Sequence, residues 1–239
     1  MILKIKPLYL LVLLSLPLIS LISCSSTEEV TTDSTCSASS SLCATPVSVT
    51  GISNSTAISG GRDHMCSLIS GGTVKCWGDN FQGQLGNGST TDSSSPVSVS
   101  NISTATGINA GEDHTCAVLS DKTVQCWGYG LYGNLGNGSD SNSYIPVTVS
   151  NISTATAVAG GEDFNCALLS DGTISCWGNG SYGSFGNGNS GTAVTNTPVI
   201  NSSVNASSVA AGDDFTCILE SGGTIKCFGD NDDGQLGAW

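Results

Sequence analysis

The feature that most constrains this chain is a sequence motif with two cysteines ten residues apart, which occurs four times. Each copy holds a cysteine, a short apolar run, a turn, a Thr, an aliphatic residue and a second cysteine that is followed by an aromatic residue and Gly. The copies begin 50, 50 and 51 residues apart. Such a period indicates a solenoid, a propeller or a related array, because one unit cannot bury its apolar surface alone.

The ten-residue spacing predicts a β-hairpin closed by a disulfide. A three-residue loop, residues 70–72, places Cys66 opposite Cys76, and such loops favour Gly at the last position, where the second copy has Lys122. At a non-hydrogen-bonded position opposed Cα atoms lie about 4.5 Å apart, within disulfide reach. The expected pairs are Cys66–Cys76, Cys116–Cys126, Cys166–Cys176 and Cys217–Cys227.

A metal site is the alternative for paired cysteines. The spacing is too long for a zinc knuckle, and the N-terminal residues described next favour a compartment in which disulfides persist. We therefore expect disulfides, no metal and no cofactor.

The N-terminus predicts an export signal. Lys4 and Lys6 precede an apolar stretch, residues 8–22, that is shorter than the roughly 20 residues of a membrane span. The sequence Leu-Ile-Ser-Cys that ends at Cys24 resembles the lipobox of bacterial lipoproteins, which implies cleavage of residues 1–23 and lipidation of Cys24. A secreted protein with an unmodified Cys24 and an uncleaved anchor are the alternatives. We expect a lipoprotein of the cell envelope or cell surface, anchored to the membrane by its lipid.

The cysteine count agrees with this assignment. The chain has 11 cysteines, an odd number that leaves one unpaired in an oxidising compartment. Assigning Cys24 to the lipid leaves ten, of which eight are in the repeats. Cys36 and Cys43 remain in the Ser- and Thr-rich segment 24–45 and are expected to pair with each other.

The residues between the cysteine motifs repeat just as regularly. Each unit has a short strand opened by Pro, a second strand near Ile58 or its equivalent, and then Gly before the hairpin. Together with the two hairpin strands this makes four strands, the number in a propeller blade, and both faces of the hairpin are apolar. We predict an all-β fold, a β-propeller of four-stranded blades with about four repeats. The expected units are 46–95, 96–145, 146–197 and 198–239.

The sequence from Cys76 to Gly88, Cys-Trp-Gly-Asp-Asn-Phe-Gln-Gly-Gln-Leu-Gly-Asn-Gly, resembles the repeat of the regulator of chromosome condensation family, in the cysteine-bearing form of exported bacterial proteins. The resemblance covers about residues 46–239. It implies a seven-bladed ring, whereas this chain has four copies and the last stops at Trp239. Two interpretations stay open: a fragment of a longer reading frame, or a short protein that completes its ring by self-association.

Charge limits the function that this resemblance implies. The formal net charge is −13, and without Lys4 and Lys6 the 4 basic and 19 acidic residues give −15. Such a surface repels phosphate backbones, so we expect no nucleic-acid partner. The eukaryotic namesake binds chromatin and exchanges nucleotide on a small GTPase. An acidic, exported chain disfavours both roles, and a shared fold does not carry function.

No catalytic residue is indicated. Acidic pairs recur at one repeat position, which favours a turn or capping role: Glu112-Asp113, Glu162-Asp163 and Asp213-Asp214, with Arg62-Asp63 in the first copy. His64 and His114 align with Phe164 and Phe215, which favours packing. We expect no enzyme; the alternative is a propeller hydrolase that acts on an extracellular polymer.

A binding rim is the more economical hypothesis. Equivalent loops of successive blades gather at one rim, and the turn after the second cysteine differs between copies: Phe81-Gln82, Leu131-Tyr132, Ser181-Tyr182 and Asp232-Asp233. Aromatic side chains on tight turns are typical of protein or glycan contacts. Turns that vary because nothing constrains them are the alternative. The predicted function is an anchored scaffold for an unknown protein or glycan.

Overall fold

The structure is a computed structural model that describes residues 46–189 and 194–237. The chain divides into two units, residues 1–47 and 48–239, and the description concerns the second unit. Cys24, Cys36 and Cys43 lie outside the described residues, so their lipidation and pairing stay predictions.

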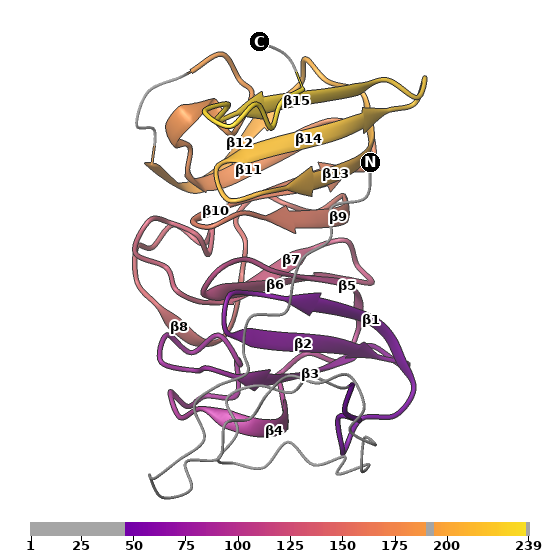
Figure 1. Ribbon diagram of the computed structural model, residues 1–239, viewed down its shortest axis with the longest axis vertical. Helices are drawn as coiled ribbons and strands as arrows, with labels where there is room; N and C mark the ends of the chain where they lie inside the picture. Colours follow the sequence, from indigo (N-terminus) through magenta and orange to yellow (C-terminus); the bar gives the residue numbers. More distant parts are fainter. Residues whose placement is uncertain (1–45, 190–193, 238–239) are drawn as a thin grey trace, which may run out of the picture. The chain divides into compact units, whose positions relative to one another are not determined.

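Within the described residues the strands form four antiparallel sheets that follow one another along the chain (Figure 1). The first holds β1 (Ser55–Gly60), β2 (His64–Ile69), β3 (Thr73–Gly78) and β4 (Ser93–Ser98). The second holds β5 (Ala105–Ala110), β6 (His114–Leu119), β7 (Val124–Gly128) and β8 (Ser143–Thr148). The third holds β9 (Ala155–Gly160), β10 (Phe164–Leu169), β11 (Ile174–Asn179) and β12 (Val194–Asn201). The fourth holds β13 (Ala206–Ala211), β14 (Phe215–Glu220) and β15 (Ile225–Gly229).

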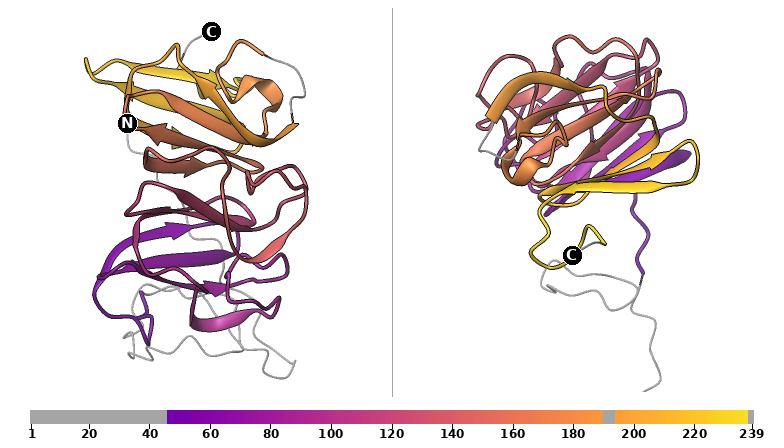
Figure 2. Two further views of the ribbon diagram at one scale, coloured as in Figure 1. Left: turned by 180° about the vertical axis from the view of Figure 1, so that it is seen from behind. Right: turned by 90° about the horizontal axis from the view of Figure 1, so that it is seen from above.

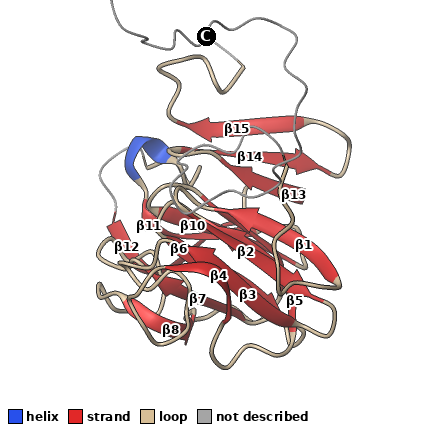
Figure 3. Ribbon diagram, turned by 60° about the horizontal axis from the view of Figure 1, so that its bottom comes forward, coloured by secondary structure: helices blue, strands red, loops and turns tan. Residues whose placement is uncertain are grey.

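Apart from one short 3-10 turn, η1 (Ser181–Gly183), the described residues are strands, turns and loops (Figure 3). No helix in these ranges has the length and hydropathy to cross a membrane. The all-β blade architecture expected from the repeats is confirmed, with four strands in each of the first three sheets.

Each sheet is displaced along the sequence from the expected units. The strand with Pro96 is β4, and it pairs with β3, where Cys76 lies opposite Val97. It is therefore the outer strand of the preceding sheet and not the first strand of the following one. In a repeating sequence any residue of the repeat can be taken as its start. Only the pairing between strands far apart in the chain shows where one sheet ends and the next begins. The sheets span 55–98, 105–148, 155–201 and 206–229.

All four expected repeat disulfides are present, each between the second and third strands of a sheet. Their Cα–Cα separations are 4.1, 4.1, 4.0 and 4.1 Å. Separations this short belong to non-hydrogen-bonded pairs, which confirms the expected hairpin register. The chain-entropy treatment gives each closed loop about 3 kcal/mol of stabilisation. Bonds of this kind persist in oxidising compartments.

The hydrophobic core is divided into three clusters, one between each pair of successive sheets. In the first cluster the Cys66–Cys76 disulfide and Leu68 pack against Ala117 and Trp127 of the next sheet. The other two clusters repeat this arrangement along the row of sheets, which Figure 2 shows from two further directions. Each inner hairpin therefore buries both faces, as its apolar pattern predicts.

In the second and third sheets a tryptophan side chain links the sheet to a loop of the preceding sheet. Trp127 is fully buried, and its Nε1 donates a hydrogen bond to the carbonyl oxygen of Gln84 at 2.9 Å. Trp177 makes the same bond to Asn134 at 2.8 Å. A Cβ at Gly86 would come within 2.7 Å of the Trp127 ring, so glycine is required where this ring enters the loop. The Leu-Gly pair of the repeat thus serves packing between sheets.

The hairpin loop of the second sheet places a lysine in a conformation that favours glycine. Lys122 has φ of 65°, in the left-handed region, where the other copies have glycine. This conformation costs a non-glycine residue roughly 1–2 kcal/mol, while glycine adds unfolded-state entropy of about 0.5–1 kcal/mol. We expect Lys122→Gly to raise the Tm measured by scanning calorimetry by a few degrees at most.

Gly72→Ala is the matched control at the equivalent position. Gly72 has φ of 89°, and an added Cβ would lie 2.8 Å from the carbonyl oxygen of Ser103. This substitution should lower the Tm, because backbone atoms of the next sheet cannot yield to it. A lower Tm for both variants would contradict the assignment of strain to Lys122.

Candidate functional site

Two sets of loops emerge at the same end of the sheets and form what we call the candidate face. Because neighbouring strands are antiparallel, the turn between the first and second strands lies at the same end as the loop between the third and fourth. The inner turns are residues 61–63, 111–113, 161–163 and 212–214. The outer loops are residues 79–92, 129–142, 180–189 and 230–237. The hairpin loops that follow the first cysteines lie at the opposite end.

Backbone hydrogen bonds hold the inner turns and outer loops together. The amide of Asp79 donates to the carbonyl oxygen of Asp63 at 2.8 Å, and Tyr129 donates to Asp113 at 2.9 Å. Asn179 and Asp230 make the equivalent bonds in the third and fourth sheets. The second acid of each inner turn therefore has the structural role that the sequence predicts.

The inner turns line a cavity of about 600 Å³ where the first strands of the four sheets end. Its charged lining residues are Arg62, Glu112, Glu162 and Asp213. Backbone hydrogen bonds join the inner turns of neighbouring sheets. The amide of Arg62 donates to the carbonyl oxygen of Glu112 at 3.1 Å, and the amide of Glu162 donates to that of Asp213 at 3.0 Å. The turns of four sheets thus form one polar arc.

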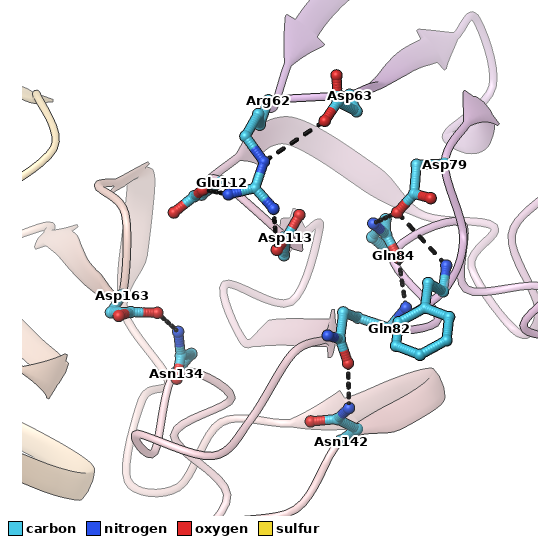
Figure 4. A network of polar contacts seen from close by, with 11 residues as sticks. Arg62, Asp63, Asp79, Gln82, Gln84, Glu112, Asp113, Asn134, Asn142 and Asp163 are labelled. Atoms are coloured by element: carbon cyan, nitrogen blue, oxygen red, sulfur yellow. Dashed lines mark hydrogen bonds and ion pairs between the residues drawn. The ribbon is translucent and has the colours of Figure 1, made fainter.

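Carboxylates dominate this arc. Arg62 contacts Glu112, lies 2.8 Å from Asp113 through Nη2, and lies 3.4 Å from Asp63 through Nε (Figure 4). Glu162 and Asp213 are exposed and also line the cavity, and the ion pairs of Arg62 go to the other three acids. The arc is therefore partly neutralised at the first and second sheets, where one guanidinium faces three carboxylates, and is more negative at the third and fourth.

The lysines of the described residues lie away from the candidate face. Lys75 donates to the carbonyl oxygen of Gly51 at 3.0 Å, and Lys226 pairs with Glu220 at 2.7 Å. Lys122 is in a hairpin loop at the opposite end of the sheets. Arg62 is thus the one cation of the candidate face among the residues described.

The acids behind the lining have raised pKa values. Burial raises the pKa of Asp113, although Arg62 opposes this, and burial with neighbouring acids raises the pKa of Asp214. Burial also raises the pKa of Asp163, against a hydrogen bond from Nδ2 of Asn134 at 3.2 Å. Negative charge is therefore disfavoured in the folded state, and an approaching cation lowers its cost.

The sequence signal for these converging carboxylates was the repeat position itself. The sequence predicted only a turn or capping role for the acidic pairs, because they recur at one repeat position in three of the four copies. Recurrence at one position of successive sheets also brings their side chains to one cavity. The same residues close the turns with their backbone and line or flank the cavity with their carboxylates. Among the described residues, no group of three or more His, Cys, Asp or Glu is arranged to hold a metal ion.

The residues of the predicted rim lie in the outer loops of the candidate face. Phe81 is 74 % exposed, and Leu131, Tyr132 and Tyr182 are also exposed. Tyr132 packs edge-on against Tyr129, with ring centroids 5.9 Å apart. We call these four exposed side chains the apolar tips. They lie on the same face as the acidic cavity, and their contact with a partner stays a prediction.

The polar members of the rim have partners within the chain. Oε1 of Gln82 accepts from Nδ2 of Asn142 at 2.6 Å (Figure 4), and Oγ of Ser181 donates to Asn179 at 2.6 Å. The amide of Asp233 donates to Oε1 of Gln235 at 3.0 Å, and Asp232 precedes it in the same turn. These bonds fix the turns from which the apolar side chains project.

Two buried histidines lie beneath the inner turns. Nε2 of His64 is 2.8 Å from Oγ1 of Thr115, and Nε2 of His114 is 3.0 Å from Oδ1 of Asn165. Burial lowers the pKa of both to about 4, so both are neutral at pH 7. Phe164 occupies the same position in the third sheet and is also buried. The packing role expected for these histidines thus includes a hydrogen bond to the next sheet.

Four-stranded antiparallel sheets that repeat along the chain and pack face to face are the blades of a β-propeller repeat protein. The Regulator of chromosome condensation (RCC1) repeat matches residues 71–118, 123–168 and 171–219, which is more than half of the chain. A second description of the same repeat matches residues 56–84, 105–134, 155–184 and 206–235. The chain belongs to the RCC1 repeat family.

Two solved structures that the chain resembles have the same fold. Human WBSCR16 is 23% identical, with a TM-score of 0.64, over 72% of this chain and 46% of that one. Prp20p of Saccharomyces cerevisiae is 22% identical, with a TM-score of 0.68, over 79% and 49%. The chain spans about half the length of these proteins, and identities this low show the fold alone. No curated protein matches the sequence.

Replacing one buried histidine with the residue of the third copy should reduce acid sensitivity. The unfolded pKa near 6.5 exceeds the folded value of about 4, so the unfolded state binds protons first and stability falls as pH drops through this window. The difference corresponds to roughly 3 kcal/mol for His64. We expect His64→Phe to remove much of this loss in Tm between pH 7 and pH 4. Thr115 keeps a partner, since its Oγ1 donates to Gln84 at 3.1 Å.

His114→Phe is the comparison variant. Its partner Asn165 would lose the donor to a buried Oδ1, and burying an unsatisfied acceptor costs about 1–3 kcal/mol. We expect a lower Tm than the wild type already at pH 7, unlike His64→Phe. A wild-type dependence of Tm on pH in both variants would show that these histidines do not determine acid sensitivity.

Proposed function

We propose that this protein is an exported, lipid-anchored propeller scaffold that binds a partner protein with a basic surface through the candidate face. The observation that supports this most is the presence of exposed apolar tips and an acidic cavity on one face. Both features are carried by loops between packed sheets, and nothing in this proposal requires catalysis.

The apolar tips would supply contact area. Tyr and Phe are large side chains with little conformational entropy to lose, and Tyr is enriched at energetically important interface positions. Phe81, Tyr132 and Tyr182 project from three successive outer loops that hydrogen bonds hold in place. A partner that spans these loops would contact a preorganised surface.

The acidic arc would supply charge selectivity. Glu162 and Asp213 are exposed and unneutralised by Arg62, and Asp163 and Asp214 behind them have raised pKa values. A Lys or Arg side chain that approaches would stabilise their ionised forms. The same field repels phosphate groups, so nucleic acid is disfavoured as a partner.

Three alternatives differ in their chemistry. A glycan would use the same apolar tips without the charge. A hydrolase would need a carboxylate pair specific to one blade, while the observed acids recur in each blade. Nucleotide exchange on a small GTPase is a function that the fold allows; Prp20p is described with binding properties to Gsp1p and histones. The acidic charge and the export signal disfavour that function for this chain.

Removing the apolar tips should strongly reduce partner capture. We expect Phe81→Ala/Tyr132→Ala/Tyr182→Ala to reduce capture from an extract of envelope proteins at least about tenfold, because large buried interface side chains contribute about 2 kcal/mol or more each when they act as hot spots. The measurement is quantitative mass spectrometry after cross-linking, with protease-treated and deglycosylated extracts in parallel. Capture that survives proteolysis but not deglycosylation would favour a glycan.

Charge-matched variants separate the face from general attraction. Glu162→Gln/Asp213→Asn removes two charges from the candidate face, and Asp121→Asn/Asp171→Asn removes two from hairpin loops at the opposite end. We expect weaker capture and a smaller salt dependence only for the first pair. Equal effects of the two pairs, or full capture by the triple alanine variant, would refute binding by this face.

The anchor is tested independently of binding. We propose that residues 1–23 are removed and that Cys24 carries lipid at the start of the Ser- and Thr-rich linker 24–45. Four disulfides support an oxidising compartment. We expect mass spectrometry of the mature N-terminus to find a lipid-modified Cys24, and Cys24→Ser to move the protein from the membrane to the soluble fraction. An unmodified Cys24 or cleavage elsewhere would refute the anchor.

A further inference from the structure

The chain itself binds one guanidinium in the acidic arc. Arg62 lies between the first and second inner turns, where it contacts Glu112 and pairs with Asp113 at 2.8 Å and with Asp63 at 3.4 Å (Figure 4). One of these carboxylates comes from its own turn and two come from the turn of the next sheet. The Arg62 side chain is 55% exposed, so these carboxylates hold a cation that is open to solvent.

The corresponding place between the third and fourth inner turns has the carboxylates of this arrangement. Its acids, which we call the acid junction, are Glu162, Asp163, Asp213 and Asp214. The last three align in the repeat with the three carboxylates that bind Arg62, and Glu162 aligns with Arg62 itself. Within residues 46–189 and 194–237, no Lys or Arg forms an ion pair with these four acids.

The backbone gives the two places the same geometry. The amide of Arg62 donates to the carbonyl oxygen of Glu112 at 3.1 Å, and the amide of Glu162 donates to that of Asp213 at 3.0 Å. Between the second and third inner turns the pattern differs, because the amide of Glu112 donates to Gly161 at 3.4 Å. The acid junction therefore repeats the backbone arrangement around Arg62, and the intervening place does not.

The carboxylates of the acid junction are close enough to repel one another. Burial raises the pKa of Asp163, and the charges of Glu162 and Asp214 raise it further, against a hydrogen bond from Asn134. Burial also raises the pKa of Asp214, and so do the charges of Glu162 and Asp213. A cation between these side chains would reduce the repulsion.

A neutral acceptor beside the third inner turn is also unused. Oδ1 of Asn109 is buried, its side chain belongs to the lining of the same cavity, and this oxygen has no hydrogen-bond partner among the residues described. The equivalent Ser59 accepts from the amide of Ala110 at 2.9 Å. An added Cβ at Gly160 would lie 2.8 Å from Asn109 Oδ1, so the glycine lets this oxygen approach the third turn. A buried acceptor without a donor is unfavourable, and a ligand with N–H groups would supply one.

A guanidinium fits this arrangement better than an ammonium group. It is planar and has five N–H donors on three nitrogens, whereas lysine presents one nitrogen. Arg62 uses all three nitrogens, because Nε, Nη1 and Nη2 each face a different carboxylate. The aligned carboxylates of the acid junction come from two turns in the same way, so they match donors that are spaced apart.

We propose that the acid junction binds the guanidinium of one arginine side chain of the partner protein, in the orientation that Arg62 has at the first two inner turns. Asp163, Asp213 and Asp214 accept from Nε, Nη1 and Nη2, respectively, and Asn109 offers a further acceptor on the cavity wall. The inference rests on the proposed function, since the partner protein supplies the arginine, and it names the group that enters the cavity.

Titration with an isolated side chain tests the site without the partner. The probe is Nα-acetyl-arginine amide, and the control is Nα-acetyl-lysine amide, which has the same net charge. In the purified, disulfide-bonded protein we expect millimolar binding that shifts the backbone amide NMR signals of Glu162 and Asp213. The Kd should be at least about threefold lower for the arginine probe, because only a guanidinium can face three separate carboxylates. Equal affinities, or no shift at these residues, would overturn the site.

The repeat provides matched variants. Glu162→Arg gives the third turn the residue of the first copy, so its own guanidinium should occupy the acid junction, abolish probe binding and raise the Tm. Arg62→Ala vacates the equivalent place and should create a second probe site, with shifts at Glu112. Lys226→Ala removes the same charge away from the inner turns and should leave one site. Probe binding that survives Glu162→Arg, or a single site in Arg62→Ala, would contradict the likeness to Arg62.

Failure of this inference can be distinguished from failure of the proposed function. We expect Glu162→Arg to weaken partner capture from the extract of envelope proteins as well as probe binding. Capture by a protein that shows no preference for the arginine probe would refute the guanidinium site alone. Probe binding without any partner capture would leave the site and refute its occupation by a partner protein.

Discussion

The structure depends on the burial of both faces of each inner sheet. A two-stranded hairpin is marginal alone, and here each is closed by a disulfide and packs against a neighbouring sheet, as Cys66 and Leu68 do against Trp127. The tryptophan ring enters a loop where Gly86 leaves room for it. Stability is then close to a sum over neighbouring sheets. This explains why the two-cysteine motif is so regular and why differences between the copies concentrate in loops.

Local pairing could be predicted from the sequence because the cysteine spacing and the turn determine it together. The Cys66–Cys76 register follows from the ten-residue spacing. The same turn pattern marks Lys122 as the copy without glycine, and Lys122 adopts the left-handed conformation that glycine has in the other copies. The phase of the sheets could not be predicted in the same way. The pairing of Cys76 with Val97 crosses the whole loop 79–92, and no local pattern distinguishes an outer strand from the first strand of the next unit.

The candidate face was foreseen in its apolar tips and missed in its charge. The tips differ between copies, which drew attention to their turns, whereas the acids recur and were therefore assigned to turn closure. Both roles are compatible, because Asp113 closes the turn with its carbonyl oxygen and meets Arg62 with its carboxylate. The raised pKa of Asp113 depends on burial, which the sequence does not reveal.

The differences between copies give the face a direction. Arg62 is bound by carboxylates of the first and second sheets, so uncompensated charge is concentrated near Glu162 and Asp213 of the third and fourth. The apolar tips occupy the first three sheets, and the fourth has Asp232-Asp233 in their place. A partner with both apolar and basic groups can match the apolar side chains of the first sheets and the acids of the last sheets in one orientation only. Identical blades would give a symmetric face, so it is the departures from the repeat that make oriented binding physically attainable.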